Sequence, residues 1–172
     1  MRTVVDVGGG TGALLAEILR TRPEVRGTLV DFSRTVARSG EIFQAAGVAD
    51  RVTVIGQSFF DPLPAGADLY LLKKVLNNWP DREATAILSR CAEAARPAAA
   101  WPAAARPAGR VVVLGSVSPD DAPRQLVMEM VLLGGKQRTV SEFRELAREA
   151  RLEVSAAGQQ PSGAFVVECR PA

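Results

Sequence analysis

Residues 3–12 decide the fold, and they read Thr3-Val4-Val5-Asp6-Val7-Gly8-Gly9-Gly10-Thr11-Gly12. The three valines predict a buried central strand, because a strand inside a parallel sheet is apolar on both faces. The glycines lack a Cβ, so the chain can turn sharply there and a ligand can approach the backbone. From Ala13 the apolar spacing becomes that of a short helix, which ends before Pro23. A strand, a glycine turn and a helix in this order are typical of the start of a nucleotide-binding α/β sheet.

The glycine turn alone does not identify its ligand. Residues 8–13 fit the dinucleotide pattern G-x-G-x-x-A. They fit equally well G-x-G-x-G preceded by an acid, which resembles motif I of the class I S-adenosylmethionine (SAM) methyltransferases. Asp31 ends the next apolar run, at about the separation from which a carboxylate reaches the ribose hydroxyls of either cofactor. No Gly-Lys-Ser/Thr follows the turn, which excludes a phosphate-binding P-loop.

The rest of the chain alternates strands and helices. We expect further strands at 27–32, 51–56, 68–73 and 110–114, and a closing antiparallel pair at 152–156 and 164–169. We expect helices from Ser33 to about Ala46, from a cap at Asp81 to Pro97, over 124–133, and from the capping box Thr139–Glu142 to Ala150. This order predicts an α/β fold with a doubly wound, mostly parallel, seven-stranded Rossmann-like sheet and a C-terminal antiparallel hairpin. Ligands are expected beyond the carboxyl ends of the strands, over the glycine turn.

Composition limits the class of protein. The chain has 172 residues, of which 47% are hydrophobic and 23% charged, and we expect a single globular domain over 1–172. The net charge is +2 and the arginines are spread along the helices, so a nucleic-acid partner is not expected. The apolar runs fall well short of the roughly 18 residues that a membrane span needs, so no membrane association is expected.

The chain contains no histidine, which removes the commonest general base, the usual zinc ligand and every Ser-His or Cys-His pair. Cys91 and Cys169 show neither a metal-binding nor a redox spacing. We interpret them as buried thiols of a reducing compartment, and we expect a cytoplasmic protein without a metal site.

One segment is repeated. Ala94-Ala95-Arg96-Pro97-Ala98 recurs at residues 104–108. The prolines prevent a continuous helix, so 97–108 is expected to form a stiff, Ala/Pro-rich surface loop. We interpret the repeat as a local duplication. The alternative is a lid or a partner contact that includes Trp101.

Several motifs resemble one family. They occur in that family's order, at Gly8–Gly12, Asp31, 58–64, 70–73, 75–81 and 134–139. Together they resemble the C-terminal catalytic domain of the SAM-dependent small-molecule O-methyltransferases, which include plant phenylpropanoid enzymes and bacterial polyketide and anthracycline tailoring enzymes. The resemblance covers the chain apart from the duplicated loop, and it favours SAM over a nicotinamide cofactor.

The resemblance implies a set of cofactor-binding residues. The backbone of the glycine turn would line the methionine part of SAM, and Asp31 would accept hydrogen bonds from both ribose hydroxyls. Ser58 and Phe59 would flank the adenine, although many relatives carry Asp at the position of Ser58. Asp6 and Asp31 would also place negative charge beside the cationic sulfur. The implied set is Gly8, Gly10, Gly12, Asp31, Ser58, Phe59 and Lys73, with Lys73 at the mouth of the site.

The catalytic base of the family is missing. Asn77 occupies the position of the histidine base of many relatives, and Gly115 and Gln137 occupy the positions of two acids that orient it in plant members. Amides cannot replace these groups as bases. An aromatic hydroxyl that is already acidic needs no base, so methyl transfer could rely on proximity alone. Asn77 is therefore the one weak candidate for a catalytic residue.

Relatives usually carry an N-terminal helical domain that dimerises and builds one wall of the acceptor pocket. This chain starts on its first strand, so we expect that domain to be absent. The chain would then be a fragment, borrow the wall from a dimer mate or a partner chain, or have an open acceptor site. Met128, Met130 and Trp79 are the candidates for the acceptor pocket within the chain.

The leading hypothesis is therefore a SAM-dependent O-methyltransferase that acts on an aromatic hydroxyl of a small natural product without a histidine base. A second hypothesis keeps SAM but replaces methylation by assisted hydroxylation or decarboxylation. A third is a non-catalytic remnant that binds the cofactor or a partner protein. A nicotinamide-dependent oxidoreductase is the last, because nothing after Asp31 offers hydride-transfer machinery.

Overall fold

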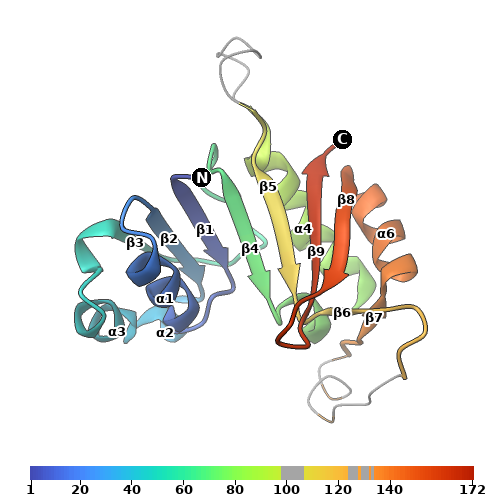
Figure 1. Cartoon of the computed structure of the whole chain (residues 1–172), viewed down its shortest axis with the longest axis horizontal. Coiled ribbons are helices and arrows are strands. Elements are labelled where there is room, and N and C mark those ends of the chain that lie inside the picture. Colours follow the sequence, from blue (N-terminus) through green and yellow to red (C-terminus); the bar gives the residue numbers. More distant parts are fainter. Residues whose placement is uncertain (98–106, 124–127, 129–131, 133) are drawn as a thin grey trace.

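The computed structural model describes residues 1–97, 107–123, 128, 132 and 134–172 (Figure 1). Within these ranges a central sheet has seven strands in the order β3-β2-β1-β4-β5-β9-β8. Strands β1 to β5 are parallel, and β9 runs antiparallel to both β5 and β8. The strands are β1 (Thr3–Val7), β2 (Arg26–Asp31), β3 (Val52–Gly56), β4 (Leu69–Lys73), β5 (Arg110–Leu114), β8 (Leu152–Gln159) and β9 (Phe165–Pro171). This order confirms the predicted fold class.

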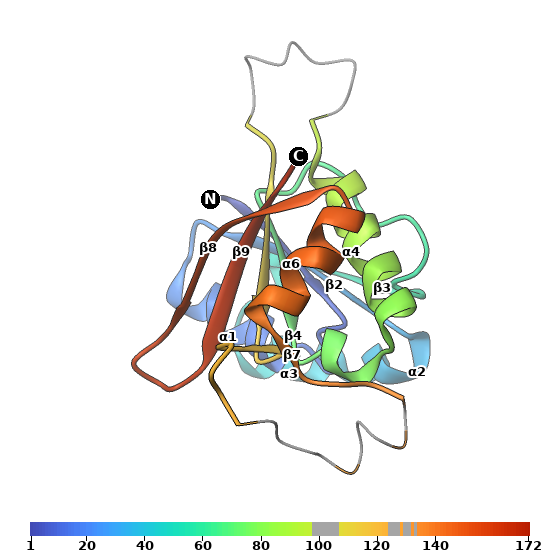
Figure 2. The ribbon, with the colours of Figure 1, turned by 90° about the vertical axis from the view of Figure 1, so that its right-hand side faces the viewer.

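Helices cover both faces of the sheet, because the side chains of each buried strand point alternately to opposite faces. Val4 joins a core cluster with Leu15 and Phe43, whereas Val5 joins a second cluster with Ile87 on the other face. The first cluster lies under α1 and α3. The second lies under α4 and α6, which run side by side in Figures 1 and 2. The helices are α1 (Ala13–Thr21), α2 (Ser33–Val36), α3 (Ser39–Ala45), α4 (Asp81–Ala95) and α6 (Val140–Glu149).

The strand order reverses at β1. The chain moves outward from β1 to β2 and β3, and then returns to the other side of β1 as β4. The carboxyl ends of β1 and β4 are therefore followed by chain segments that leave in opposite directions. In parallel sheets of this kind the crevice at such a reversal is where ligands bind.

The predicted helix from Ser33 to Ala46 is wrong, because the segment forms the two short helices α2 and α3. The Ser39 hydroxyl donates to the Val36 carbonyl at 2.8 Å, a local bond that competes with the helical pattern. Ser33 does not cap a helix either, since its hydroxyl donates to the carbonyl of Gly56 in β3 at 3.0 Å.

Two predicted helix caps have different outcomes. The capping box of α6 is confirmed: the Thr139 hydroxyl accepts from the Glu142 N–H, and the Glu142 carboxylate accepts from the Thr139 N–H. The predicted cap at Asp81 is wrong. Pro80 is the N-cap residue of α4, and the carboxylate of Asp81 is paired with Lys136 and Arg138 instead.

A small parallel pair formed by β6 (Val117–Ser118) and β7 (Arg138–Thr139) was not predicted, because neither strand is long enough to show an alternation. The predicted helix over 124–133 and the loop over 97–108 lie almost wholly outside the described residues. Within the described part of the chain, no helix is both long enough and apolar enough to cross a membrane.

Candidate active site

A cavity of about 270 Å³ lies at the carboxyl ends of β1, β2 and β4. The glycine turn after β1, the end of β2 and the segment after β4 all contribute to it. Of the sequence-predicted site residues it brings together Gly8, Asp31 and Phe59. Its lining consists of Gly8, Asp31, Phe32, Phe59, Lys74, Val75, Asn78 and Trp79.

The glycine turn leaves open space above its backbone. Gly10 has a φ of 64°, in the left-handed region that favours glycine, and a Cβ built there would meet no atom of the described residues within 4 Å. Gly9 has the opposite environment, because its Cβ would overlap the carboxylate of Asp6. The turn therefore packs tightly on its inner side and is accessible from outside at Gly10.

Asp31 connects the turn to the end of β2. One carboxylate oxygen accepts from the Gly10 N–H at 2.8 Å, and the other accepts from the Phe32 N–H at 2.7 Å. The residue is 6% exposed, so its carboxylate is held almost out of water. Each oxygen keeps a second lone pair and can still accept one hydroxyl proton. This arrangement suits the two neighbouring hydroxyls of a ribose.

Asp6 lies beneath the glycine turn, where its Cγ and one oxygen pack against Gly9. It is 1% exposed, and neither of its carboxylate oxygens has a partner among the described residues. The pKa of Asp6 is raised from its ordinary 3.8 to about 7, mainly by burial and to a smaller extent by repulsion from Asp31, although Lys73 opposes the shift. Near neutral pH only about half of the molecules carry a charge at this position. Asp31 is therefore the better source of the expected negative charge.

Aromatic rings form one wall of the cavity. The Phe59 ring lies 4.9 Å from that of Phe32 and 6.0 Å from that of Trp79, centroid to centroid. Phe60 packs edge-on against Trp79 at 5.0 Å. The sequence interpretation included Phe59 but missed Phe32, although Phe32 directly follows Asp31. Such a wall suits a flat aromatic group.

Four of the predicted cofactor-binding residues do not line the cavity: Gly10 and Gly12 lie in the glycine turn, and Ser58 and Lys73 lie beside the cavity. Ser58 precedes Phe59, and its hydroxyl accepts from the Phe60 N–H at 3.2 Å. Lys73 is the exposed last residue of β4, close enough to Asp6 to affect the pKa of that carboxyl. The neighbouring Lys74 lines the cavity instead. Its φ of 55° turns the chain sharply at the end of the strand.

Asn77 lies in the short helical turn η2 (Leu76–Asn78) that follows β4. Its amide oxygen accepts from the Ser116 hydroxyl at 2.9 Å, and its amide nitrogen donates to the Asn78 side-chain oxygen at 3.3 Å. The Asn78 nitrogen donates in turn to the Lys74 carbonyl at 3.2 Å. Sequence reasoning missed Ser116, because it becomes a neighbour only where β4 and β5 pair.

A fully buried arginine holds this segment. The guanidinium of Arg138 donates to the carbonyls of Leu76 and Trp79, each at 2.8 Å, and to the carboxylate of Asp81 at 2.9 Å. Burial alone would raise the pKa of Asp81, but hydrogen bonds from Lys136 and Arg138 hold it below its ordinary value. The segment that carries Asn77, Asn78 and Trp79 is therefore fixed at both ends.

The proposed acceptor residues are only partly accounted for. Trp79 lines the cavity, whereas Met128 is 75% exposed and Met130 lies outside the described residues. In the part of the chain that the structure describes, no group of three or more cysteine or acidic side chains is arranged to hold a metal ion.

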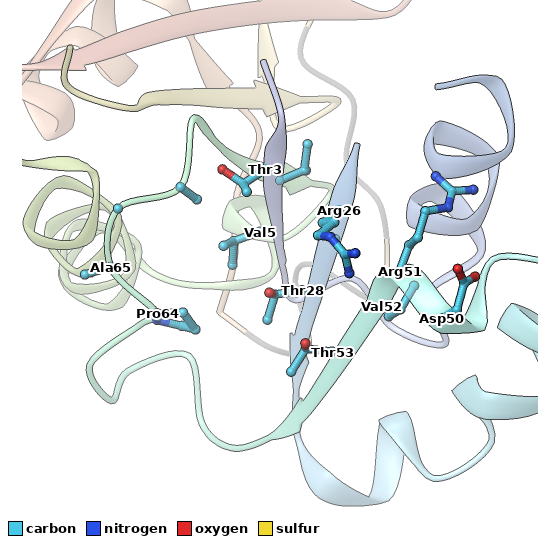
Figure 3. Close-up of a pocket in the computed structure, with 14 residues that line it drawn as sticks. Thr3, Val5, Arg26, Thr28, Asp50, Arg51, Val52, Thr53, Pro64 and Ala65 are labelled. Carbon is cyan, nitrogen blue, oxygen red and sulfur yellow. The ribbon is translucent and has the colours of Figure 1, made fainter. Parts of the chain in front are cut away.

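A second cavity, of about 230 Å³, lies near the amino ends of β1, β2 and β3. Figure 3 shows Thr28 and Thr53 on neighbouring strands, with Pro64 and Ala65 on the loop opposite. This cavity is remote from the glycine turn, at the end of the sheet where ligands rarely bind in such folds. We therefore assign the candidate site to the first cavity.

A family model of the O-methyltransferase domain matches residues 1–152. The chain belongs to this family. Among curated proteins, this O-methyltransferase domain is 41% identical over 156 residues to 2,7-dihydroxy-5-methyl-1-naphthoate 7-O-methyltransferase of Streptomyces carzinostaticus, covering 90% of this chain and 44% of that protein. It is also 39% identical over 170 residues to aclacinomycin 10-hydroxylase RdmB of Streptomyces purpurascens, covering 95% of this chain and 42% of that protein.

A solved structure supports the same relationship. NcsB1, an O-methyltransferase from neocarzinostatin biosynthesis crystallised with SAM and 2-hydroxy-5-methyl naphthoic acid, superposes with a TM-score of 0.85 at 38% identity. The match covers 99% of this O-methyltransferase domain and 49% of NcsB1. The chain thus spans about half the length of the relatives it matches. These comparisons confirm the family resemblance and the fold inferred from the sequence.

Proposed function

We propose that this O-methyltransferase domain uses SAM to methylate an aromatic hydroxyl of a small natural product, without a side chain that acts as a base. One observation supports the proposal most strongly: Gly8 of the glycine turn, the buried carboxylate of Asp31 that also binds the Gly10 N–H, and an aromatic wall meet at one cavity. The complex of NcsB1 with SAM and a hydroxynaphthoic acid supports the same assignment.

The residues around the cavity fit SAM. The backbone at Gly8, Gly10 and Gly12 is proposed to contact the methionine part, and Asp31 to accept the ribose hydroxyls. Phe59 is proposed to flank the adenine. When bound, SAM supplies a methyl group on a sulfonium, which an oxygen nucleophile accepts while the carbon–sulfur bond breaks.

Ser58 and Lys73 have more peripheral proposed roles. The Ser58 hydroxyl would contact the adenine edge, and Lys73 would lie at the mouth of the site, although neither lines the cavity as it stands. Both roles come from the family resemblance, and their test is the SAM affinity of the alanine variants.

The missing base limits the acceptor. General-base catalysis contributes about 10² to 10⁴ to a rate, and a phenol of pKa about 10 is only about 0.1% ionised at neutral pH. A hydroxyl acidified by an electron-poor ring compensates for most of that factor. The acceptor wall that the N-terminal domain builds in relatives is proposed to come from a dimer mate, a partner chain or further sequence.

Calorimetry tests the cofactor assignment. SAM and its demethylated product S-adenosylhomocysteine (SAH) should bind, and NAD should not. Asp31→Ala should weaken SAM binding at least about 100-fold, because two hydrogen bonds to a charged group, worth about 1.5–3 kcal/mol each, are lost. Asp50→Ala, at an exposed carboxylate beside the second cavity, is the matched control. Unchanged SAM affinity in Asp31→Ala would refute the assignment.

Labelled SAM tests the reaction. Incubation with a panel of hydroxynaphthoates should add one methyl group to the acceptor, as read by product mass. A gain of oxygen would instead indicate hydroxylation, the activity for which one relative is named, and a loss of carbon dioxide would indicate decarboxylation.

A further inference from the structure

Four groups beside the cavity form a chain of hydrogen bonds with only one consistent direction. The Lys74 carbonyl can only accept, so the Asn78 atom that faces it at 3.2 Å must be the amide nitrogen. The Asn78 oxygen then faces Asn77, which must present its own nitrogen, at 3.3 Å. The Asn77 oxygen therefore faces the Ser116 hydroxyl, which must donate, at 2.9 Å. Reversing the Asn78 amide would set two oxygens against each other.

This direction determines what Asn77 can offer. Its oxygen already accepts a proton donor from Ser116, which is completely buried. Its nitrogen has two hydrogens, of which one is bonded to Asn78. In the described ranges the second hydrogen has no partner. At the position where relatives carry a base, this chain therefore presents a hydrogen-bond donor.

Asn77 itself does not line the cavity, but the donor lies next to its wall. Asn78 and Trp79, the two residues after Asn77, line the cavity wall. Arg138 binds the Leu76 and Trp79 carbonyls on either side of the Asn77–Asn78 pair. Arg138 thus fixes the backbone, and Ser116 and Asn78 hold the Asn77 side chain, so the placement of the amide costs little further ordering when a ligand binds.

The charges around the cavity are mixed. Lys74 lines it and Lys73 is an exposed neighbour, whereas Asp31 lies on the wall and Asp6 beneath the glycine turn. Asp31 is proposed to be covered by the ribose when the nucleoside is bound. Lys74 then remains as the cation on the wall, on the same segment as Asn77.

We propose that Asn77 donates a hydrogen bond to an acceptor oxygen that is already ionised, and that Ser116 and Asn78 are positioning residues for this donor. The inference rests on the proposed function and names its substrate class: aromatic hydroxyls acidified by a carbonyl, quinone or nitro group. An oxygen that enters as an anion leaves no proton to be removed on methylation. An amide donor is then sufficient where a neutral phenol would need a base.

Absorbance of 4-nitrophenol, whose ionised form absorbs visible light, tests the inference. The phenol is titrated with pH in the presence of the full chain saturated with SAH. In the wild type its pKa should fall by about one unit on binding, because the anion binds about tenfold more tightly than the neutral form. Asn77→Asp, of nearly identical shape, should reverse the shift by placing a negative charge beside the oxygen.

Ser116→Ala tests the positioning role. Its shift should be less than half that of the wild type, because one of the two hydrogen bonds that hold the Asn77 amide is lost. Ser39→Ala is the matched control: Ser39 is equally buried and also donates one hydrogen bond, but in α3. It should match the wild type, and circular dichroism should be the same for all four proteins.

Several outcomes overturn the inference. They are no spectral change on binding, no preference for the ionised form, and an Asn77→Asp protein that binds the anion as well as the wild type. SAH calorimetry on the same samples separates this result from the proposed function. If SAH binds but the shift is absent, only the role of Asn77 fails. If SAH does not bind, the proposed function fails, and the titration is repeated without SAH and judged by the same criteria.

Discussion

The buried carboxyl of Asp6 makes the stability of this domain depend on pH in a direction opposite to that of most acidic residues. Burial and the nearby Asp31 raise its pKa from 3.8 to about 7. The folded protein therefore binds this proton more tightly than the unfolded chain does. Well below pH 3.8 the carboxyl is protonated in both the folded and the unfolded state, so it does not lower the free energy of unfolding. As the pH rises to about 7, only the unfolded chain loses the proton, so the free energy of unfolding falls.

The magnitude follows from the size of the shift. A rise of about three pKa units corresponds to about 4 kcal/mol, which is fully expressed above pH 7. Asp6→Asn removes the titration. It adds an amide that lacks partners, at a constant cost of about 1–3 kcal/mol. This constant cost cancels when two pH values are compared. The free energy of unfolding of the variant minus that of the wild type should therefore increase by about 3 kcal/mol between about pH 4.5 and pH 8.

Urea unfolding followed by circular dichroism at both pH values measures this difference. Asp50→Asn, at an exposed carboxylate, controls for the loss of one negative charge. A buried carboxyl that titrates near neutrality should change the difference in free energy of unfolding between Asp6→Asn and the wild type by about 3 kcal/mol. A change of less than about 1 kcal/mol between the two pH values would refute the reasoning.

Two further substitutions test other parts of the site. Arg138→Lys should lower the free energy of unfolding by about 2–4 kcal/mol, because an ammonium cannot reach the acceptors that the guanidinium binds in one plane. Arg148→Lys, at an exposed pair with Glu145, should change it by less than about 0.5 kcal/mol, and equal losses in urea unfolding would contradict the role of Arg138. Gly12→Ala should cost about 2–4 kcal/mol, because φ is 87° and the new Cβ would overlap Phe43. In Gly10→Ala the new Cβ meets no atom of the described part of the chain, so the variant should lose only about 1–2 kcal/mol from its φ of 64°. A larger loss than in Gly12→Ala would contradict this packing.

Local features of the sequence were sufficient to predict much of this domain. The valine run and the glycine turn predict a strand, a turn and a helix because each depends on residues only a few positions apart. The capping box of Thr139 and Glu142 was predictable for the same reason, since both partners lie within one helical turn. The doubly wound, mostly parallel sheet then followed from the alternation of strands and helices, which leaves few ways to wind such a sheet. Asp31 could be assigned to the site because it ends the strand beside the glycine turn.

Only the tertiary structure decided how the polar side chains are paired. The sequence predicts Asp81 as a helix cap, but in the structure its carboxylate accepts a hydrogen bond from Arg138, which lies 57 positions later in the chain. Asn77 looks like a lost base in the sequence, yet its amide oxygen is occupied by the hydroxyl of Ser116, 39 positions away, so only its nitrogen is left to offer a hydrogen bond. The sequence presents Asp6 as a charge beside the turn, whereas its burial and the nearby Asp31 raise its pKa to about 7. The periodicity of the sequence predicts which face of a helix or strand is buried. It does not predict which distant group faces a buried polar atom, and that pairing determines the charge of the atom and the direction of its hydrogen bond.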